Sequence, residues 1–314
     1  MKGLELARQY YFTIGAPMVQ QKFPEYQERI AAGLVGMGSE CFGFDDEISR
    51  DHDWGPTFCL WLTRADYQAF GVRLQAEFEN LPKAFAGFSR KESAWGQGRT
   101  GVFEIGEFYK QFIGLDHPPE SAREWRFIPE VNLATATNGQ VFTDPLGEFT
   151  TFRARILEFY PEDIRLKKLA SRCMTIAQAG QYNYMRCVRR REYVAAHWNE
   201  AKFISDLISL VFLLNRAYRP FPKWMHRAMQ KLPILGADLY DRLLRLVTFS
   251  EGASPQSLHE QKASLMEEMC QLVIRELRRE GLGDSPSDFL LDHGPVLQSH
   301  IQEAQVRTID VWAE

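Results

Sequence analysis

The sequence predicts an α+β fold, in which a domain with a mixed β-sheet is followed by an all-α helical bundle. The first half alternates short apolar runs with amphipathic stretches, whereas the chain after about Tyr160 has only helical periodicity. A length of 314 residues usually divides into two domains. We therefore predict a sheet-containing domain over residues 1–159 and a helical domain over residues 160–314.

The first half contains two clear strand candidates. Thr57–Leu62 is a bulky apolar run bounded by Pro56 and Thr63, which predicts a buried strand. Val102–Ile105 predicts another. An Asn-Gly turn at residues 138–139 separates the apolar runs 131–136 and 141–143. Helical spacing predicts helices over residues 4–12, 23–34, 64–81 and 108–115.

The second half is predicted to be helical throughout. The expected helices cover residues 167–179, 183–217, 223–231, 237–249 and 257–280. The most apolar stretch, residues 203–214, is interrupted by Asp206 and is shorter than the roughly 20 residues that a membrane span needs. It predicts a buried helix of a soluble bundle.

The composition narrows the range of partners. Apolar and charged residues make up 45% and 25% of the chain, which excludes disordered and fibrous classes. A net charge of -4 argues against a broad nucleic-acid footprint, although it leaves room for a local basic cleft. The chain has 5 cysteines without a CxxC pair, and no signal-peptide pattern. We predict a reduced, cytoplasmic protein with neither a nucleic-acid nor a membrane partner.

Two aspartates directly before the first strand candidate suggest a metal site. On a strand, Asp51 and Asp53 would point to the same side, because side chains alternate with period two. Their carboxylates would then lie within about 5 Å of each other and repel. A divalent cation relieves such repulsion, and Mg²⁺ prefers carboxylate and phosphate oxygens. We therefore predict that Asp51 and Asp53 bind Mg²⁺, and that Asp53→Ala leaves the fold intact or more stable.

A small-residue turn precedes these aspartates. Gly38 and Ser39 allow backbone N–H groups to approach phosphate oxygens closely, as in many anion-binding turns. A metal and such a turn together can position a triphosphate for in-line attack. Gly38 and Ser39 are therefore predicted to bind the phosphates of a nucleotide.

The Gly38-Ser39 turn followed by Asp51-His52-Asp53 resembles the DNA polymerase beta-like nucleotidyltransferase superfamily. The resemblance implies a nucleotidyltransferase mixed-sheet domain that takes a third acid from the next strand, here Glu104. Glu104 would complete the metal site or accept a proton from the acceptor. His52 departs from the pattern, because the superfamily usually has an apolar residue there.

The second half carries a further likeness. Residues 215–224, NRAYRPFPKW, are similar to the helical partner domains of kanamycin and streptomycin-type nucleotidyltransferases. The whole chain is also similar to an uncharacterised bacterial family with GSE…DDEISRDHDWGP and GQYNYMR motifs. Since Arg50 is the only cation beside the aspartates, we expect Lys223 or one of Arg186–Arg191 to face them and bind phosphate.

Several residues allow both a functional and a structural interpretation. Asp144 is a rival third acid, although its Asp-Pro-Leu-Gly context also explains it as a turn residue. The acidic loop 45–47 could bind a cationic substrate or form a solvated loop. His52 could order Asp51 or serve the fold alone. Glu104 could be a partly exposed strand acid.

The resemblance implies a Mg²⁺-dependent enzyme that moves a nucleoside monophosphate from a triphosphate, with ATP preferred, to a hydroxyl of a small-molecule acceptor. Two alternatives belong to other classes. One is protein AMPylation, as in toxin–antitoxin pairs. The other is a nucleotide-binding regulator that no longer turns over, which the retained pair of repelling acids at Asp51 and Asp53 argues against.

Overall fold

The computed structural model describes residues 1–94, 96–248 and 255–314. The chain divides into two compact units, the first made of Met1–Glu120 and Ile128–Glu158, the second of Ser121–Phe127 and Phe159–Glu314. Every described strand belongs to the first unit, and the described part of the second unit is helical. The α+β fold class is therefore confirmed.

The first unit is built around a four-stranded mixed sheet with the order β5-β2-β1-β6. Strand β1 runs antiparallel to both β2 and β6, whereas β2 and β5 are parallel. The strands are β1 (Ala31–Leu34), β2 (Cys59–Leu62), β5 (Gly101–Glu104) and β6 (Gln140–Thr143). The carboxyl end of β1 thus meets the amino ends of the other three strands, and we call this end of the sheet the motif end.

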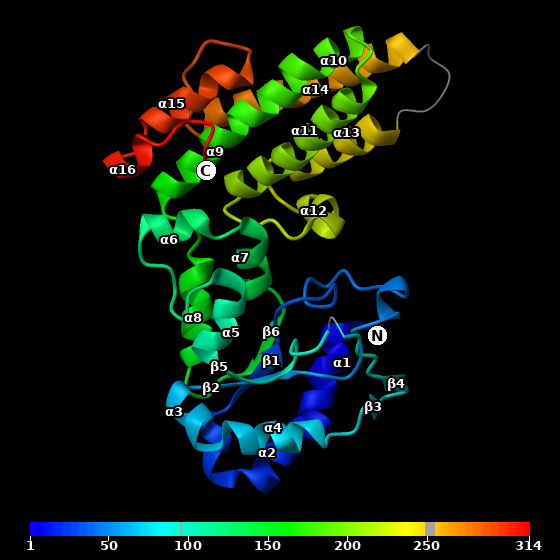
Figure 1. Ribbon diagram of the computed structural model, residues 1–314, viewed down its shortest axis with the longest axis vertical. Coiled ribbons are helices and arrows are strands. Elements are labelled where there is room, and N and C mark those ends of the chain that lie inside the picture. The colour runs from blue at the N-terminus through cyan, green and yellow to red at the C-terminus, as the bar shows by residue number, and fades with distance from the viewer. Residues whose placement is uncertain (95, 249–254) are drawn as a thin grey trace. The chain divides into compact units, whose positions relative to one another are not determined.

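Helices cover both faces of this sheet (Figure 1). One face carries α1 (Gly3–Tyr10), a π-helical turn (Tyr11–Gly15), α2 (Ala16–Lys22), α3 (Arg64–Asp66), a second π-helical turn (Tyr67–Gly71) and α4 (Val72–Glu79). The other carries α5 (Ile105–Ile113), α7 (Glu130–Thr137) and α8 (Glu148–Leu157). A hairpin of β3 (Ala84–Phe85) and β4 (Phe88–Ser89) follows α4.

The alternation along β2 explains why the sheet is buried on both faces. Leu60 and Leu62 join the aromatic core that packs against the first helical layer. Between them, Trp61 points the other way and stacks on Phe149 of α8, with ring centroids 3.8 Å apart. A strand that is buried on both faces has apolar residues at consecutive positions, which is why the apolar run at β2 predicts it.

The helix predicted over residues 23–34 is wrong. The chain forms a 3-10 helix at Pro24–Arg29 and then enters β1. At Gly33 an added Cβ would lie 2.4 Å from the carbonyl oxygen of Gln140, so β1 passes too close to β6 for any side chain there. Pairing on both sides, rather than local propensity, makes this segment a strand.

The second unit is a helical bundle. Its longer helices are α9 (Glu162–Ile176), α11 (Tyr193–Leu214), α13 (Gly236–Thr248) and α14 (Pro255–Arg279). Shorter ones are α6 (Ala122–Phe127), α10 (Met185–Arg189), α12 (Pro222–Met229), α15 (His293–Ser299), α16 (Ala304–Arg307), a π-helical stretch (Ala177–Tyr184) and a 3-10 turn (Leu290–Asp292).

The helix predicted over residues 183–217 is interrupted. It breaks after α10, where Arg191 has a φ of +62°, and resumes as α11. Residues 207–214 of α11 are buried, as the sequence predicts. No helix in the described ranges is long and apolar enough to cross a membrane.

Candidate functional site

The glycine turn lies at the motif end, directly after β1. Gly36 and Gly38 have φ values of +119° and +131°, a region that favours glycine. The side chain of Asn138 fixes the turn through two hydrogen bonds to Gly36. Its Oδ1 accepts from the backbone N of Gly36 at 2.8 Å, and its Nδ2 donates to the Gly36 carbonyl at 2.7 Å. The turn is thus held in place by a residue a hundred positions away.

The two aspartates do not lie on a strand, so this part of the prediction is wrong. They occupy a bend before β2, and Asp53 has a φ of +50°. Gly55, with a φ of +142°, and Pro56 follow, and β2 begins only at Cys59. The alternation of strand side chains therefore does not relate Asp51 to Asp53.

The environments of these two carboxylates differ. The side chain of Asp51 is 63% exposed, and its Oδ1 lies 2.7 Å from Nδ1 of His52. The side chain of Asp53 is 9% exposed. Its two oxygens accept from the backbone N of Ser93 at 2.7 Å and from the Ser93 hydroxyl at 2.8 Å. Asp53 is thus the embedded member of the pair, and Asp51 faces solvent beside His52.

Arg99 joins the glycine turn to Asp53. Its Nη1 lies 3.7 Å from Asp53 Oδ2, and its Nη2 lies 3.5 Å from Glu40 Oε1. The same Nη2 donates to the carbonyl of Met37 inside the turn. An added Cβ at Gly38 would lie 2.5 Å from this Nη2, so a side chain there would displace the Arg99 guanidinium. Sequence reasoning missed Arg99, whose only local signal is its place in the glycine-rich loop before β5.

The pKa shifts at this cluster go in opposite directions. Burial alone would raise the pKa of Asp53, but the two hydrogen bonds from Ser93 and the charge of Arg99 outweigh it, so the pKa lies below its ordinary value. Burial raises the pKa of Glu40, and Arg99 only partly opposes this. Asp53 is therefore the acid whose charge this structure favours.

Glu104 and Asp144 lie at the opposite end of the sheet from Asp53. Glu104 ends β5, and its side chain caps α5 by accepting from the backbone N of Glu107 at 2.7 Å. Asp144 follows β6 and accepts from the backbone N of Thr150 at 2.7 Å, which supports the turn reading. The structure therefore does not bring either acid together with Asp53.

The motif end has its own cations. Arg90, Lys91 and Arg99 line a small hollow of about 20 Å³ together with Asp53 and Glu40. The sequence pointed to Arg50 as the only nearby cation, and this is wrong. An isolated bridge between Trp54 and Lys91 brings the segment around Lys91 back beside the aspartates, which the sequence separation does not reveal.

Arg50 itself is engaged elsewhere. Its guanidinium donates to the carbonyl of Met1 at 3.0 Å and lies 5.0 Å from the ring centroid of Trp54. These contacts give Arg50 a packing role beside the amino terminus of the chain.

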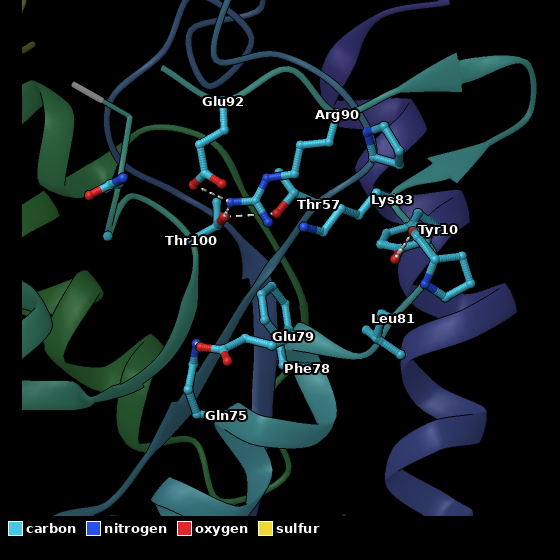
Figure 2. Close-up of a pocket in the computed structure, with 14 residues that line it drawn as sticks. Tyr10, Thr57, Gln75, Phe78, Glu79, Leu81, Lys83, Arg90, Glu92 and Thr100 are labelled. Atoms are coloured by element: carbon cyan, nitrogen blue, oxygen red, sulfur yellow. Dashed lines mark hydrogen bonds and ion pairs between the residues drawn. The ribbon is translucent and has the colours of Figure 1, made fainter. Parts of the chain in front are cut away.

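A larger hollow of about 380 Å³ adjoins the small one. The two share Thr57, Arg90, Glu92 and Thr100 as a common wall. Figure 2 shows Arg90 reaching across this wall, where its Nη2 donates to Glu92 Oε1 at 2.8 Å and to Thr100 Oγ1 at 2.9 Å. Thr57 donates to the same Thr100 oxygen at 2.8 Å.

The acidic loop 45–47 is solvated at Asp46 and Glu47 but not at Asp45. Asp45 is only 1% exposed, and its Oδ2 accepts from the backbone N of Gly3 at 2.8 Å and from Trp54 Nε1 at 3.1 Å. Asp46 is exposed and accepts from the backbone N of Ser49 at 3.0 Å. Asp45 therefore ties the start of α1 to this loop, which is a structural role.

The arrangement fits one kind of metal binding and not another. Within the described ranges, no group of three or more His, Cys, Asp or Glu side chains is placed to hold a metal ion. A site made by Asp51, Asp53 and Glu104 together is therefore not formed. A carboxylate has about four acceptor positions, so Asp53 can still contribute one ligand to a magnesium ion that a triphosphate largely coordinates.

The two cations predicted in the second half lie in the second unit. Arg186, on α10, places its guanidinium 4.4 Å from the ring centroid of Tyr182. Lys223, on α12, places its amine 5.1 Å from the ring centroid of Trp224. Their predicted contact with a nucleotide stays a prediction.

Comparison with known proteins gives two matches. Residues 125–225 match a family described as a domain of unknown function, DUF4037. The chain is similar to the crystal structure of a nucleotidyltransferase-like protein from Exiguobacterium sibiricum 255-15, with a TM-score of 0.35 and 10% sequence identity. That similarity covers 89% of this chain and 81% of the other. No curated protein matches the sequence.

Proposed function

We propose that this protein is a nucleotidyltransferase, which binds a nucleoside triphosphate, preferably ATP, at the motif end of its first unit. It would move the nucleoside monophosphate to a hydroxyl of a small-molecule acceptor. The observation that carries the proposal is the contact of one guanidinium, that of Arg99, with both the glycine turn and Asp53. The two parts of the sequence motif thus meet at one place.

Three cations lie where we propose that the triphosphate binds. Arg90, Lys91 and Arg99 line the small hollow beside the glycine turn, where Glu40, Asp53 and Glu92 balance their charge. Cations and backbone N–H groups fixed before the reaction stabilise charge that develops on transferring phosphoryl groups. When bound, Mg²⁺ would neutralise phosphate charge, with Asp53 as one ligand and Asp51 as a solvent-facing second acid.

Glu92 replaces Glu104 as the proposed base, because it lines both hollows. In the proposed step, the acceptor hydroxyl oxygen forms a bond to the α-phosphorus. The bond between the α-phosphorus and the oxygen that bridges it to the β-phosphorus breaks. Pyrophosphate leaves, and the hydroxyl proton passes to the Glu92 carboxylate. The hydrogen bond from Arg90 orients the Glu92 carboxylate.

The test uses α-labelled ATP, a panel of metabolites or a cell lysate, and assays with and without Mg²⁺. We expect label to move to a small molecule only with Mg²⁺, and Asp53→Asn to reduce the rate at least about 100-fold. Asp144→Asn and Glu104→Gln are matched controls from the other end of the sheet and should keep most of the activity. Equal rates for Asp53→Asn and wild type would contradict the proposal.

The same assay separates the alternatives. Label that stays on a protein would identify an AMPylating enzyme instead. Nucleotide binding with no transfer to any acceptor would identify a regulator. Arg186→Gln tests the proposed contribution of the second unit to nucleotide binding.

A further inference from the structure

The larger hollow contains groups of two kinds at opposite sides. Arg90 and Lys83 lie at one side, and Figure 2 shows the Lys83 side chain extending toward Arg90 and Thr57. Gln75 and Glu79 of α4 lie at the other side, where Gln75 Nε2 donates to Glu79 Oε1 at 2.8 Å. The hollow thus offers a cationic side and a hydrogen-bonding carboxylate side.

Each side has binding capacity that the fold does not use. Arg90 is fixed by two hydrogen bonds from one nitrogen, Nη2, out of the five N–H groups of a guanidinium. Lys83 forms no ion pair with any described residue. The backbone N of Val102 donates to Gln75 Oε1 at 2.8 Å. This hydrogen bond orients Gln75 and, through it, the Gln75–Glu79 pair.

The charge balance limits what can bind. Lys83 and Arg90 are matched by Glu79 and Glu92 among the lining residues, so the hollow is close to neutral. Lys83, which forms no ion pair with a described residue, leaves one cation in this hollow for a single anionic group. Carboxylate, amide and hydroxyl groups around a floor of Phe78, as found here, match a ligand rich in hydroxyl groups.

We propose that this hollow binds a small polyhydroxylated molecule, such as a sugar or polyol, that carries one phosphate or carboxylate group. The anionic group would bind Lys83 and Arg90, and hydroxyl groups would donate to Glu79. Because the hollow shares a wall with the Asp53 site, this molecule is the nucleotide acceptor. The acceptor role rests on the proposed function, whereas the binding site itself does not.

The test is calorimetric titration of the full chain without nucleotide, using glucose 6-phosphate, gluconate, glucose and inorganic phosphate. We expect glucose 6-phosphate or gluconate to bind at least tenfold more tightly than glucose or phosphate alone. The better of the two shows whether the anion is a phosphate or a carboxylate. No binding of either, or equal binding of inorganic phosphate, would overturn the proposal.

Variants assign the two sides of the hollow. Lys83→Ala should weaken the anionic ligand at least fivefold and leave glucose unchanged, and Lys83→Arg should restore most of the affinity. Glu79→Gln should weaken glucose as well. Lys110→Ala, in an exposed lysine of α5 outside the hollow, is the matched control. If Lys83→Ala leaves the affinity for the anionic ligand unchanged, Lys83 does not bind the anionic group. That result would overturn this assignment even if the protein transfers a nucleotide from ATP.

Discussion

At the scale of single residues, Asp53 is the part of the motif that the structure embeds most deeply. Asp53→Ala should lower the free energy of unfolding by about 1–3 kcal/mol, because it leaves the N–H and O–H of Ser93 without their acceptor. Asp53→Asn should cost less, since asparagine keeps one oxygen and tolerates a φ of +50° better than alanine. Urea unfolding measures both. This reverses the sequence expectation that Asp53→Ala is harmless.

The same residue gives a pH dependence. The pKa of Asp53 is lowered in the folded state, so its charged form stabilises the fold. This stabilisation is present above the pKa of the unfolded chain and is lost as the pH falls through the folded pKa. The difference in the free energy of unfolding between wild type and Asp53→Asn should therefore decrease as the pH falls from about 5 to about 3. A difference that stays constant over this range would show that the charge is not what stabilises the bend.

Two glycines of one loop test how tightly Asp53 is enclosed. An added Cβ at Gly96 would lie 1.9 Å from Asp53 Oδ1, whereas at Gly98 it would meet nothing within 4 Å. Gly96→Ala should therefore displace the carboxylate and reduce nucleotide transfer at least about tenfold. Gly98→Ala should lower the free energy of unfolding by only roughly 1–2 kcal/mol, because of the positive φ, and should leave Asp53 in place. It should therefore retain more activity than Gly96→Ala, although Gly98 lines the larger hollow. Equal activities would place Asp53 outside the reaction.

At the scale of elements, α9 buries a lysine that anchors the end of the chain. Lys167 donates to Gln298 Oε1 at 2.8 Å and to the carbonyl of Asp310 at 2.7 Å. Burial, with the charge of Arg126, lowers its pKa from 10.5 to about 8. Between these two values the unfolded chain holds a proton that the folded chain releases, so stability from this group rises with pH.

Lys167→Met should remove that contribution. The free energy of unfolding of wild type, minus that of Lys167→Met, should increase between pH 7.5 and pH 10, by at most about 1.4 kcal/mol per pH unit. Denaturant titrations at several pH values provide the measurement. Parallel pH curves would mean that Lys167 keeps its proton when folded.

Strands β1 and β2 show which elements the sequence could predict. The run at β2 is bulky and apolar, so its own residues predict a buried strand. The residues of β1, Ala-Ala-Gly-Leu, have little intrinsic preference for a strand, and pairing with β2 and β6 decides their conformation. The helix predicted over residues 108–115 forms as α5, but it begins at Ile105, which the sequence placed in the preceding strand.

At the scale of the whole molecule, the open question is which unit supplies the cations that bind the nucleotide. The sequence pointed to Lys223, whereas the first unit already holds Arg99 beside Asp53. Arg99→Gln should weaken ATP binding, and more strongly at low salt, where charge contacts are least screened. Lys223→Gln should do the same if α12 also contributes.

ATP titrations of both variants at two ionic strengths distinguish these sources. Thermal unfolding of each variant is the control, because Arg99 also pairs with Glu40. Unchanged affinity of Arg99→Gln at both ionic strengths would contradict the proposed site. Unchanged affinity of both Lys223→Gln and Arg186→Gln would assign nucleotide binding to the first unit alone.

The sequence by itself determined the α+β class and the helical second half, because periodicity and apolar runs are local properties of the chain. It also predicted a site at Gly38 and Asp53, whose roles stay predictions. Only the tertiary structure decided the rest of the site. Arg99 reaches Asp53 across 45 intervening positions, and Glu104 caps a helix at the far end of the sheet. Strand order and direction set which residues meet, and no local pattern encodes them.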